Sequence, residues 1–143
     1  MKKVKQLLES KTQAVWSVRP DASVLHALEV LAARGVGALV VMDGSTLVGI
    51  LSERDYARKV ALRGKSSLDT QVAEIMVEDV LYVTPDHNTD ECMALMSSRR
   101  IRHLPVVDQG RVVGMLSIGD LVKNLLEEQK NTIEQLEQYI RGT

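Results

Sequence analysis

The sequence lacks the features that mark secreted, membrane-spanning and nucleic-acid-binding proteins. It holds one cysteine in 143 residues, Cys92, so no disulfide can form within the chain. No stretch approaches the roughly 20 apolar residues of a membrane helix, and no apolar run of signal-peptide length follows the charged opening. A formal net charge of −1 gives no general case for nucleic acid, which usually needs a concentrated positive field. We therefore expect a cytoplasmic protein with no membrane or nucleic-acid partner.

An internal repeat organises the sequence. The stretch GILSERD, Gly49–Asp55, returns as GMLSIGD, Gly114–Asp120. When the chain is shifted by 65 residues, Val15–Val60 lies on Val80–Leu125 without a gap, and 13 of the 46 aligned pairs are identical. Duplication of this quality is seldom chance, and two copies are too few for a solenoid. We expect two halves that cover each other's apolar faces.

Each copy shows the same succession of local signals. A short extended run, VWSV or VLYV, precedes a helix start at which Ser23 and Asn88 are the expected N-caps. Apolar residues then recur at helical spacing as far as Gly35 in the first copy. Two β-rich runs follow, joined by a short glycine-containing turn that indicates a hairpin, and a second helix begins near Glu53 or Ile118. The order strand, helix, strand, strand, helix predicts an α+β fold.

The repeat also sets the expected boundaries. We expect a first unit over 4–64, a polar connection over 65–71, a second unit over 72–126 and a C-terminal helical extension over 127–143. An apolar stripe runs along this last helix among charged residues: Leu126, Ile133, Leu136 and Ile140. Such a stripe packs either on the protein's own core or on a partner subunit, and the sequence does not decide between them.

Four motifs stand in a fixed order: V-x-P-D before the first helix, RHLPVVD on a middle strand, EIM at the start of a unit and G-x-x-S-x-x-D at its end. In this order and at a fixed offset, they resemble the CBS domain, a family named for cystathionine β-synthase. The resemblance covers about Val4 to Leu126 and implies two CBS units packed as a pseudo-two-fold pair. It implies a regulatory module that forms a homodimer, binds AMP, ADP, ATP, S-adenosylmethionine or NAD(H) in clefts between the units, and signals to an unknown regulated protein by conformational change.

The closing motif suits a ribose. Ser52 and Asp55 lie three residues apart across a strand-to-helix turn, and Ser117 and Asp120 repeat them. A carboxylate has two acceptor oxygens, so it can accept hydrogen bonds from both ribose hydroxyls, and such charge-assisted bonds are about twice as strong as neutral ones. By resemblance these four residues are the ribose-binding positions. The residues between them differ in the two copies, which favours two sites of unequal preference.

The resemblance also implies positions for the adenine and the phosphates. An adenine needs an apolar slot and backbone groups for its edge, which the family takes from the residue before the proline and from the start of the middle strand. The corresponding residues are Arg19, Val36, Gly37, Ala38, Thr84, Ile101, Arg102 and His103. Phosphates need cations or free backbone amides, and the candidates are Arg54, Arg58, Arg102 and His103.

Plainer interpretations of the same residues stay open. Serine and aspartate favour helix N-termini, so both Ser–Asp pairs can be simple caps. The chain is then a ligand-independent dimerisation and interaction module with vestigial clefts.

His87, Asp90 and Glu91 stand at a helix start without a second convergent cluster, so we expect capping and no metal site. Cys92 falls on the inward face of that helix, which favours a core residue. No nucleophile–base pair or phosphate loop has adequate spacing, so we expect no catalytic residues, and nucleic-acid binding by the arginines near residue 100 is a minor alternative.

Overall fold

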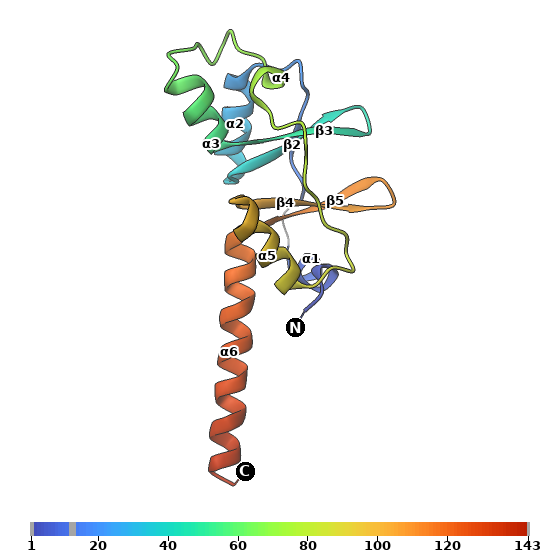
Figure 1. The fold of residues 1–143 in the computed structure, drawn as a ribbon, viewed down its shortest axis with the longest axis vertical. Coiled ribbons are helices and arrows are strands. Elements are labelled where there is room, and N and C mark those ends of the chain that lie inside the picture. The colour runs from blue at the N-terminus through green and yellow to red at the C-terminus, as the bar shows by residue number, and fades with distance from the viewer. Residues whose placement is uncertain (1, 12–13, 143) are drawn as a thin grey trace. The chain divides into compact units, whose positions relative to one another are not determined.

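The structure, a computed structural model, describes residues 2–11 and 14–142 (Figure 1). It has the mixed helix and strand content predicted for an α+β fold. The elements, of which η1 is a π-helix, are α1 (Val4–Ser10), β1 (Ser17–Val18), α2 (Val24–Arg34), β2 (Ala38–Asp43), β3 (Thr46–Ser52), α3 (Glu53–Tyr56), η1 (Ala57–Ala61), α4 (Val72–Ile75), α5 (Thr89–Arg99), β4 (His103–Asp108), β5 (Arg111–Ser117) and α6 (Ile118–Ile140).

The chain divides into two compact units. One comprises the described residues of Met1–Thr12, Val83–Val106 and Gly114–Thr143, and the other those of Gln13–Tyr82 and Val107–Val113. The first three strands form one sheet, and β4 and β5 form a second, two-stranded sheet. Each unit holds most of one copy of the repeat.

The unit that holds most of the first copy is built on the three-stranded sheet. β1 pairs parallel with β2, with Val18 opposite Val41, and β2 pairs antiparallel with β3. α2 begins at the expected cap Ser23, whose hydroxyl accepts a hydrogen bond from His26 N at 3.0 Å. It ends at Gly35, which has a φ of 63°, a left-handed conformation that glycine adopts at little cost. Both predicted ends of this helix are confirmed.

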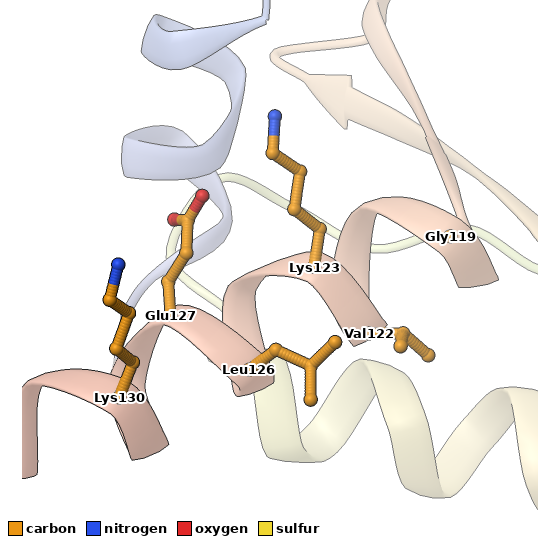
Figure 2. A pocket seen from close by; sticks show the side chains of 6 residues that line it. All are labelled: Gly119, Val122, Lys123, Leu126, Glu127 and Lys130. Carbon is orange, nitrogen blue, oxygen red and sulfur yellow. The ribbon is translucent and has the colours of Figure 1, made fainter. Parts of the chain in front are cut away.

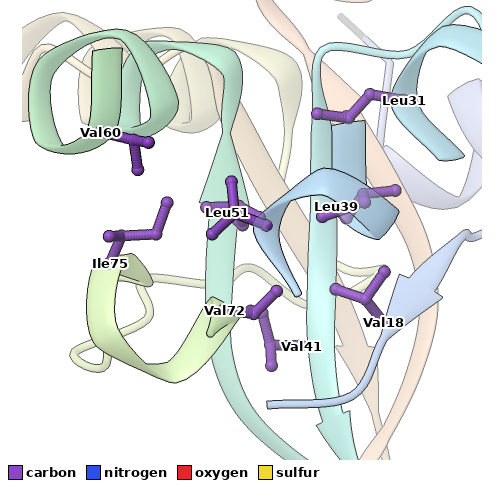
Figure 3. Packing of buried hydrophobic residues seen from close by; sticks show 10 residues of the cluster. Val18, Leu31, Leu39, Val41, Leu51, Val60, Val72 and Ile75 are labelled. Carbon is purple, nitrogen blue, oxygen red and sulfur yellow. The ribbon is translucent and has the colours of Figure 1, made fainter. Parts of the chain in front are cut away.

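The core of this unit lies where α2 and α4 meet the sheet (Figure 3). α2 contributes Val24, Ala27 and Leu31, which recur every three or four residues and so share one face. β2 is buried from Ala38 to Val41, a continuous apolar run typical of a strand covered on both faces. The cluster consists of Val18, Val24, Ala27, Leu31, Leu39, Val41, Leu51, Val60, Val72 and Ile75. Its side chains come from every strand of the sheet, which fixes the helix start that follows β3.

The second unit repeats the helix ends with different residues. Asn88 caps α5: its side chain accepts a hydrogen bond from Glu91 N at 2.9 Å, and Glu91 Oε1 accepts one from Asn88 N at 3.2 Å. This is the reciprocal capping box that the sequence predicts. α5 ends at Arg100, which has a φ of 54°, where the first copy has glycine. A left-handed conformation costs a non-glycine residue roughly 1–2 kcal/mol, so this helix end is the less favourable of the two.

The strand expected at the start of the second copy is wrong in extent. VLYV does not form a strand, and only Val83 makes a parallel bridge, to Val106. In the first copy, Val40 N donates to Trp16 O at 3.3 Å and helps to hold β1. Pro105 occupies the position of Val40 in the repeat and has no N–H, so the matching hydrogen bond cannot form. One substitution in the middle strand thus explains the shortened pairing.

The last helix differs between the copies as well. In the first copy α3 has one α-helical turn and passes into the π-helix η1, whereas in the second copy α6 continues for 23 residues. The predicted start at Ile118 and the helical C-terminal extension are therefore confirmed as far as Ile140, while Thr143, the predicted end, lies outside the described residues. Over residues 2–11 and 14–142, no helix combines the length and apolarity that a membrane crossing requires.

The short lead-in helices are exchanged between the copies. α1 precedes the first copy in the sequence but belongs to the unit of α5 and α6, and α4 opens the second copy but belongs to the unit of α2. Each lead-in packs on the glycine that begins the repeated motif. A Cβ added at Gly114 would lie 2.4 Å from Leu8 Cδ2, and one added at Gly49 would lie 2.6 Å from Met76 Sδ. The repeated glycine is thus explained by close approach of the lead-in.

We expect Gly114→Ala to lower the free energy of unfolding by about 1–3 kcal/mol, because the new methyl group overlaps Leu8 and forces it to move. Gly119→Ala is a control in the first turn of α6: its Cβ meets only Ser117 Oγ at 3.6 Å. Alanine is the better helix former, so this control should be neutral or stabilising by up to about 1 kcal/mol. Urea unfolding of both variants measures the difference, and equal stabilities would contradict the packing described.

Candidate ligand-binding site

The predicted ribose pair of the first copy forms the start of α3. Ser52 is the N-cap, and its hydroxyl accepts a hydrogen bond from Asp55 N at 3.3 Å. Asp55 Oδ2 in turn accepts from Ser52 N and from Ser52 Oγ, each at 2.9 Å. The two residues therefore make a complete capping box, which rigidly orients the carboxylate at the end of β3.

A lysine holds the other oxygen of this carboxylate. Lys59 Nζ lies 3.3 Å from Asp55 Oδ1 and donates a hydrogen bond to Ile75 O at 2.9 Å. The Asp55 side chain is 13% exposed and that of Lys59 is 36% exposed. The ammonium group thus links the ribose candidate to the end of α4 and lies at the solvent-facing side of the pair.

The second copy repeats the cap but takes its lysine from elsewhere. Asp120 Oδ2 accepts from Ser117 N at 2.8 Å, and Asp120 N donates to Ser117 Oγ at 3.2 Å. Lys11 Nζ, at the end of α1, lies 2.8 Å from the same Oδ2 and also donates to Met115 O. The side chains of Lys11 and Asp120 are 22% and 29% exposed. The exchanged lead-in therefore delivers a cation to the second ribose candidate.

These contacts set the charge state of Asp120. Burial by itself would raise the pKa of this carboxyl, but the hydrogen bond from Lys11, the bond from the Ser117 backbone and the positive charge of Lys11 together outweigh it. The pKa of Asp120 is therefore lowered from its ordinary value. The group is ionised at neutral pH, as an acceptor for two hydroxyl groups must be.

The two lysines occupy different positions of the repeat, and neither has a lysine at the equivalent position of the other copy. The residue that corresponds to Lys59 is Asn124, and the residue that corresponds to Lys11 by alignment of the lead-ins is Asp79. Asn124 is 3% exposed, and its Oδ1 has no hydrogen-bond partner within the described part of the chain. Each copy therefore has one lysine beside its carboxylate, from a different element. The sequence reasoning missed both lysines as partners of the carboxylates. The spacing of four residues between Asp55 and Lys59 was a signal for the first, whereas only the fold brings Lys11 next to a residue 109 positions away.

The start of each middle strand is held against the Ser–Asp turn of the same copy. Glu53 N donates to Gly37 O at 3.1 Å, and Ile118 N donates to Arg102 O at 2.8 Å. These bonds bring Gly37 and Arg102, two of the adenine candidates, next to the ribose candidates of their own copy. In the first copy, Val36, Gly37 and Glu53 border a hollow of about 380 Å³, together with Leu28, Leu31, Ala32 and Gly35.

The residues before the two repeated prolines, Pro20 and Pro85, have local partners instead. Arg19 is an exposed side chain whose Nε lies 3.0 Å from Asp21 Oδ1. Thr84 Oγ1 lies 2.9 Å from His87 Nδ1, and Thr84 N donates to the same nitrogen at 3.0 Å. His87 therefore orders the turn before α5. Among the described residues no group of three or more His, Cys, Asp or Glu side chains is placed to hold a metal ion.

The remaining candidates differ in exposure. Ala38 is buried in β2, and Ile101 and His103 are half-buried around the start of β4. Arg54 is half-buried in α3, whereas Arg58 in η1 and Arg102 before β4 are exposed. Their roles toward adenine and phosphate stay predictions.

Cys92 lies in the core, as the sequence suggests. The side chain is fully buried in α5. Burial raises the pKa of its thiol to about 11, and the nearby charge of Glu91 adds to the rise. The reactive thiolate is therefore scarce at neutral pH, which supports a packing role over a redox role.

The duplicated unit, closed in each copy by a capped Ser–Asp helix start and a lysine, defines a tandem pair of small α+β domains with matched polar turns. The chain belongs to the CBS domain family: the model described as CBS domain matches residues 4–62 and 72–127. Both copies are matched, so the resemblance inferred from the motifs is confirmed. CBS pair proteins are regulatory modules.

Several proteins are similar over most of the chain. The mitochondrial CBS domain-containing protein CBSX3 of Arabidopsis thaliana is 39% identical over 127 residues; the match covers 85% of this chain but 62% of that protein. The CBS-domain protein ATU1752 of Agrobacterium tumefaciens is 40% identical, with a TM-score of 0.82 and coverage of 86% and 98%. A CBS domain pair solved with 5′-methylthioadenosine and S-adenosyl-L-methionine is 26% identical, with a TM-score of 0.79 and coverage of 90% and 98%.

Proposed function

We propose that the chain is a regulatory module that binds an adenosine-containing nucleotide, of the AMP, ATP or NAD(H) type, through Asp55 and Asp120. The ligand state is passed to a partner protein by a change of conformation. The observation that carries the proposal is the capped Ser–Asp turn, which is present in both copies and orients a carboxylate in each. In the second copy the contacts of Asp120 also lower its pKa. The similar CBS pair that holds two adenosine derivatives supports the ligand class.

Ribose binding must compete with the lysines. A carboxylate has about four acceptor positions, and the cap and the lysine together occupy at most three of them in each copy. In the first copy three positions are taken, so one ribose hydroxyl can bind but a second must displace Lys59. In the second copy two positions are taken, so both hydroxyls can bind while Lys11 stays in place. A displaced Lys59 is then available to a phosphate group, so the proposal favours a phosphorylated ligand over adenosine in the first copy.

The same contacts favour a second candidate function. Both carboxylates are already satisfied by a helix cap and a lysine, which is what a purely structural pair would show. In that case the chain is a ligand-independent dimerisation and interaction module whose ligand sites are vestigial. A nucleotide-binding module and a ligand-independent module differ in one measurable property: only the first is stabilised by nucleotides.

Thermal unfolding with a panel of AMP, ATP, NAD, NADH and S-adenosylmethionine separates the two functions. A ligand at 100 times its dissociation constant stabilises the folded state by about 2.7 kcal/mol. For a chain of this size each kcal/mol raises the melting temperature by about 2–4 °C. We expect at least one phosphorylated member of the panel to give such a rise. The absence of any rise at millimolar concentration would favour the interaction module.

A further inference from the structure

The C-terminal half of α6 carries an exposed apolar face. Every residue from 131 to 140 is exposed, and α6 extends well past the strands of its unit (Figure 1). We call the stripe of five large apolar side chains along this helix the α6 seam: Val122, Leu126, Ile133, Leu136 and Ile140, which are 42%, 60%, 55%, 57% and 81% exposed. A helix of this kind gains most of its stability from what covers its apolar face.

The spacing of the seam is that of a coiled coil. From Val122 the positions advance by 4, 3, 4, 3 and 4 residues to Ile140, with the polar Gln129 as the third member. This 3.5-residue period keeps a seam facing a single partner helix. The buried residues of α6, Leu121 and Asn124, lie on a different face, which packs in its own unit. The helix therefore has separate inward and outward apolar faces.

The start of the seam has the shape of a coiled-coil hole. In a coiled coil each side chain inserts between four residues of the facing helix. Gly119, Val122, Lys123 and Leu126, at spacings of 3, 1 and 3 residues, border a hollow of about 380 Å³, with Glu127 and Lys130 at its rim. In Figure 2 the side chains of Val122 and Leu126 extend to one side of the helix and those of Lys123 and Lys130 to the other.

We propose that the α6 seam binds the same seam of a second copy of the chain, with the two helices antiparallel. If the two-fold axis passes near residue 131, Val122 meets the partner's Ile140, Leu126 meets the partner's Leu136, and Gln129 meets the partner's Ile133. Every member of the seam then has a partner, and the hollow beside Val122 receives the end of the facing helix. This inference does not depend on the proposed ligand.

The charges beside the seam favour the antiparallel direction. Lys123, Lys130 and Glu137 recur every seven residues along one flank. In an antiparallel pair this flank faces the same flank of the partner helix. Two pairs of opposite charge then form, each between Lys123 of one helix and Glu137 of the other. Only one pair of like charge, between the two exposed Lys130 side chains, lies near the axis. In a parallel pair this flank faces the other flank, which is Ile118, Leu125, Thr132 and Tyr139 and offers no ion pair.

The area also suits a second copy. Five exposed apolar side chains on each helix give on the order of 1,000 Å² of total buried surface, the lower end of what a specific interface needs. A helix of 23 residues is about 34 Å long, so the whole seam is covered by an equal helix. The partner that matches the seam in length, period and charge is therefore the seam itself.

Sedimentation of the full chain tests the proposal. We expect a mass of at least twice 15.8 kDa for the native chain, and half the native stoichiometry for Ile133→Lys, which places a charge in the seam. Asn131→Lys adds the same charge to the same exposed stretch but away from the seam, so it should keep the native stoichiometry. A monomeric native chain, or Ile133→Lys with the native stoichiometry, would overturn the proposal.

Disulfide trapping tests the direction of the helices. Leu126→Cys and Leu136→Cys are made as separate proteins, and the buried Cys92 does not compete. In the antiparallel pair, each variant alone stays uncrosslinked under mild oxidation, and only the mixture forms an interchain disulfide. If each variant crosslinks with itself, or if the mixture gives no product, the antiparallel seam is wrong.

Discussion

The Asp55→Asn, Asp120→Asn double variant should lose the thermal stabilisation by nucleotides that the native chain shows. Asparagine keeps the size of aspartate and an oxygen that can accept from the cap, so the helix starts should survive. It removes the charge and one acceptor from each ribose candidate. Hydrogen bonds to a charged partner contribute about 1.5–3 kcal/mol each, so the affinity at each site should fall by at least tenfold.

The repeat offers a matched control for this variant. Asp43 and Asp108 occupy equivalent positions at the ends of β2 and β4, and both are exposed. The Asp43→Asn, Asp108→Asn variant has the same net charge as the test variant but leaves both helix starts untouched. We expect it to keep the full nucleotide response. If the two double variants respond alike, Asp55 and Asp120 do not hold the ligand.

Lys11→Met should lower the free energy of unfolding by about 1–3 kcal/mol at neutral pH. The substitution leaves Asp120 ionised and partly buried without its cation, and removes the charged donor to Met115 O. Lys5→Met is the control, because Lys5 is an exposed lysine of the same helix and the change of charge is identical. Urea unfolding of the three proteins gives the difference, and a Lys11 variant as stable as the Lys5 variant would contradict the ion pair.

The part of the Lys11 effect that comes from Asp120 should be lost in acid. Contacts in the folded state lower the pKa of Asp120, so its ionised form stabilises the fold above the ordinary pKa of about 3.9. That stabilisation is lost as the pH falls through the lowered folded-state value, where the carboxyl is protonated in both states. The stability difference between the native chain and Lys11→Met should therefore be full at pH 7 and shrink below about pH 4. A gap that is unchanged in acid would assign the effect to packing.

Local chemistry made much of the fold predictable. Ser23, Gly35 and Asn88 act at helix ends through bonds to their immediate neighbours, so short sequence patterns are enough to place them. The duplication then doubled the evidence for each element. Pro105 shows the limit of that reasoning, because the repeat suggested a strand pairing that a missing N–H in the middle strand prevents.

The candidate site was predictable only in part. The Ser–Asp turns are local, and the structure forms both of them. Lys59 is also local, since it lies four residues after Asp55. Lys11 is not local: it reaches Asp120 because α1 packs in the unit of the second copy. A comparison of the two copies would have given a signal, since Lys59 is replaced by Asn124 while its carboxylate partner is kept. The difference between GILSERD and GMLSIGD thus accompanies a change in the element that supplies the lysine beside the carboxylate.

Calorimetric titration of the native chain with AMP and with 2′-deoxy-AMP tests the central claim most directly. The two ligands differ by one hydroxyl group, and no residue is changed, so helix capping and stability are the same in both experiments. If Asp55 or Asp120 holds the ribose diol, the deoxy ligand should bind at least tenfold more weakly, as the loss of one charge-assisted hydrogen bond requires. Equal affinities for the two ligands, or no heat with either, would contradict it.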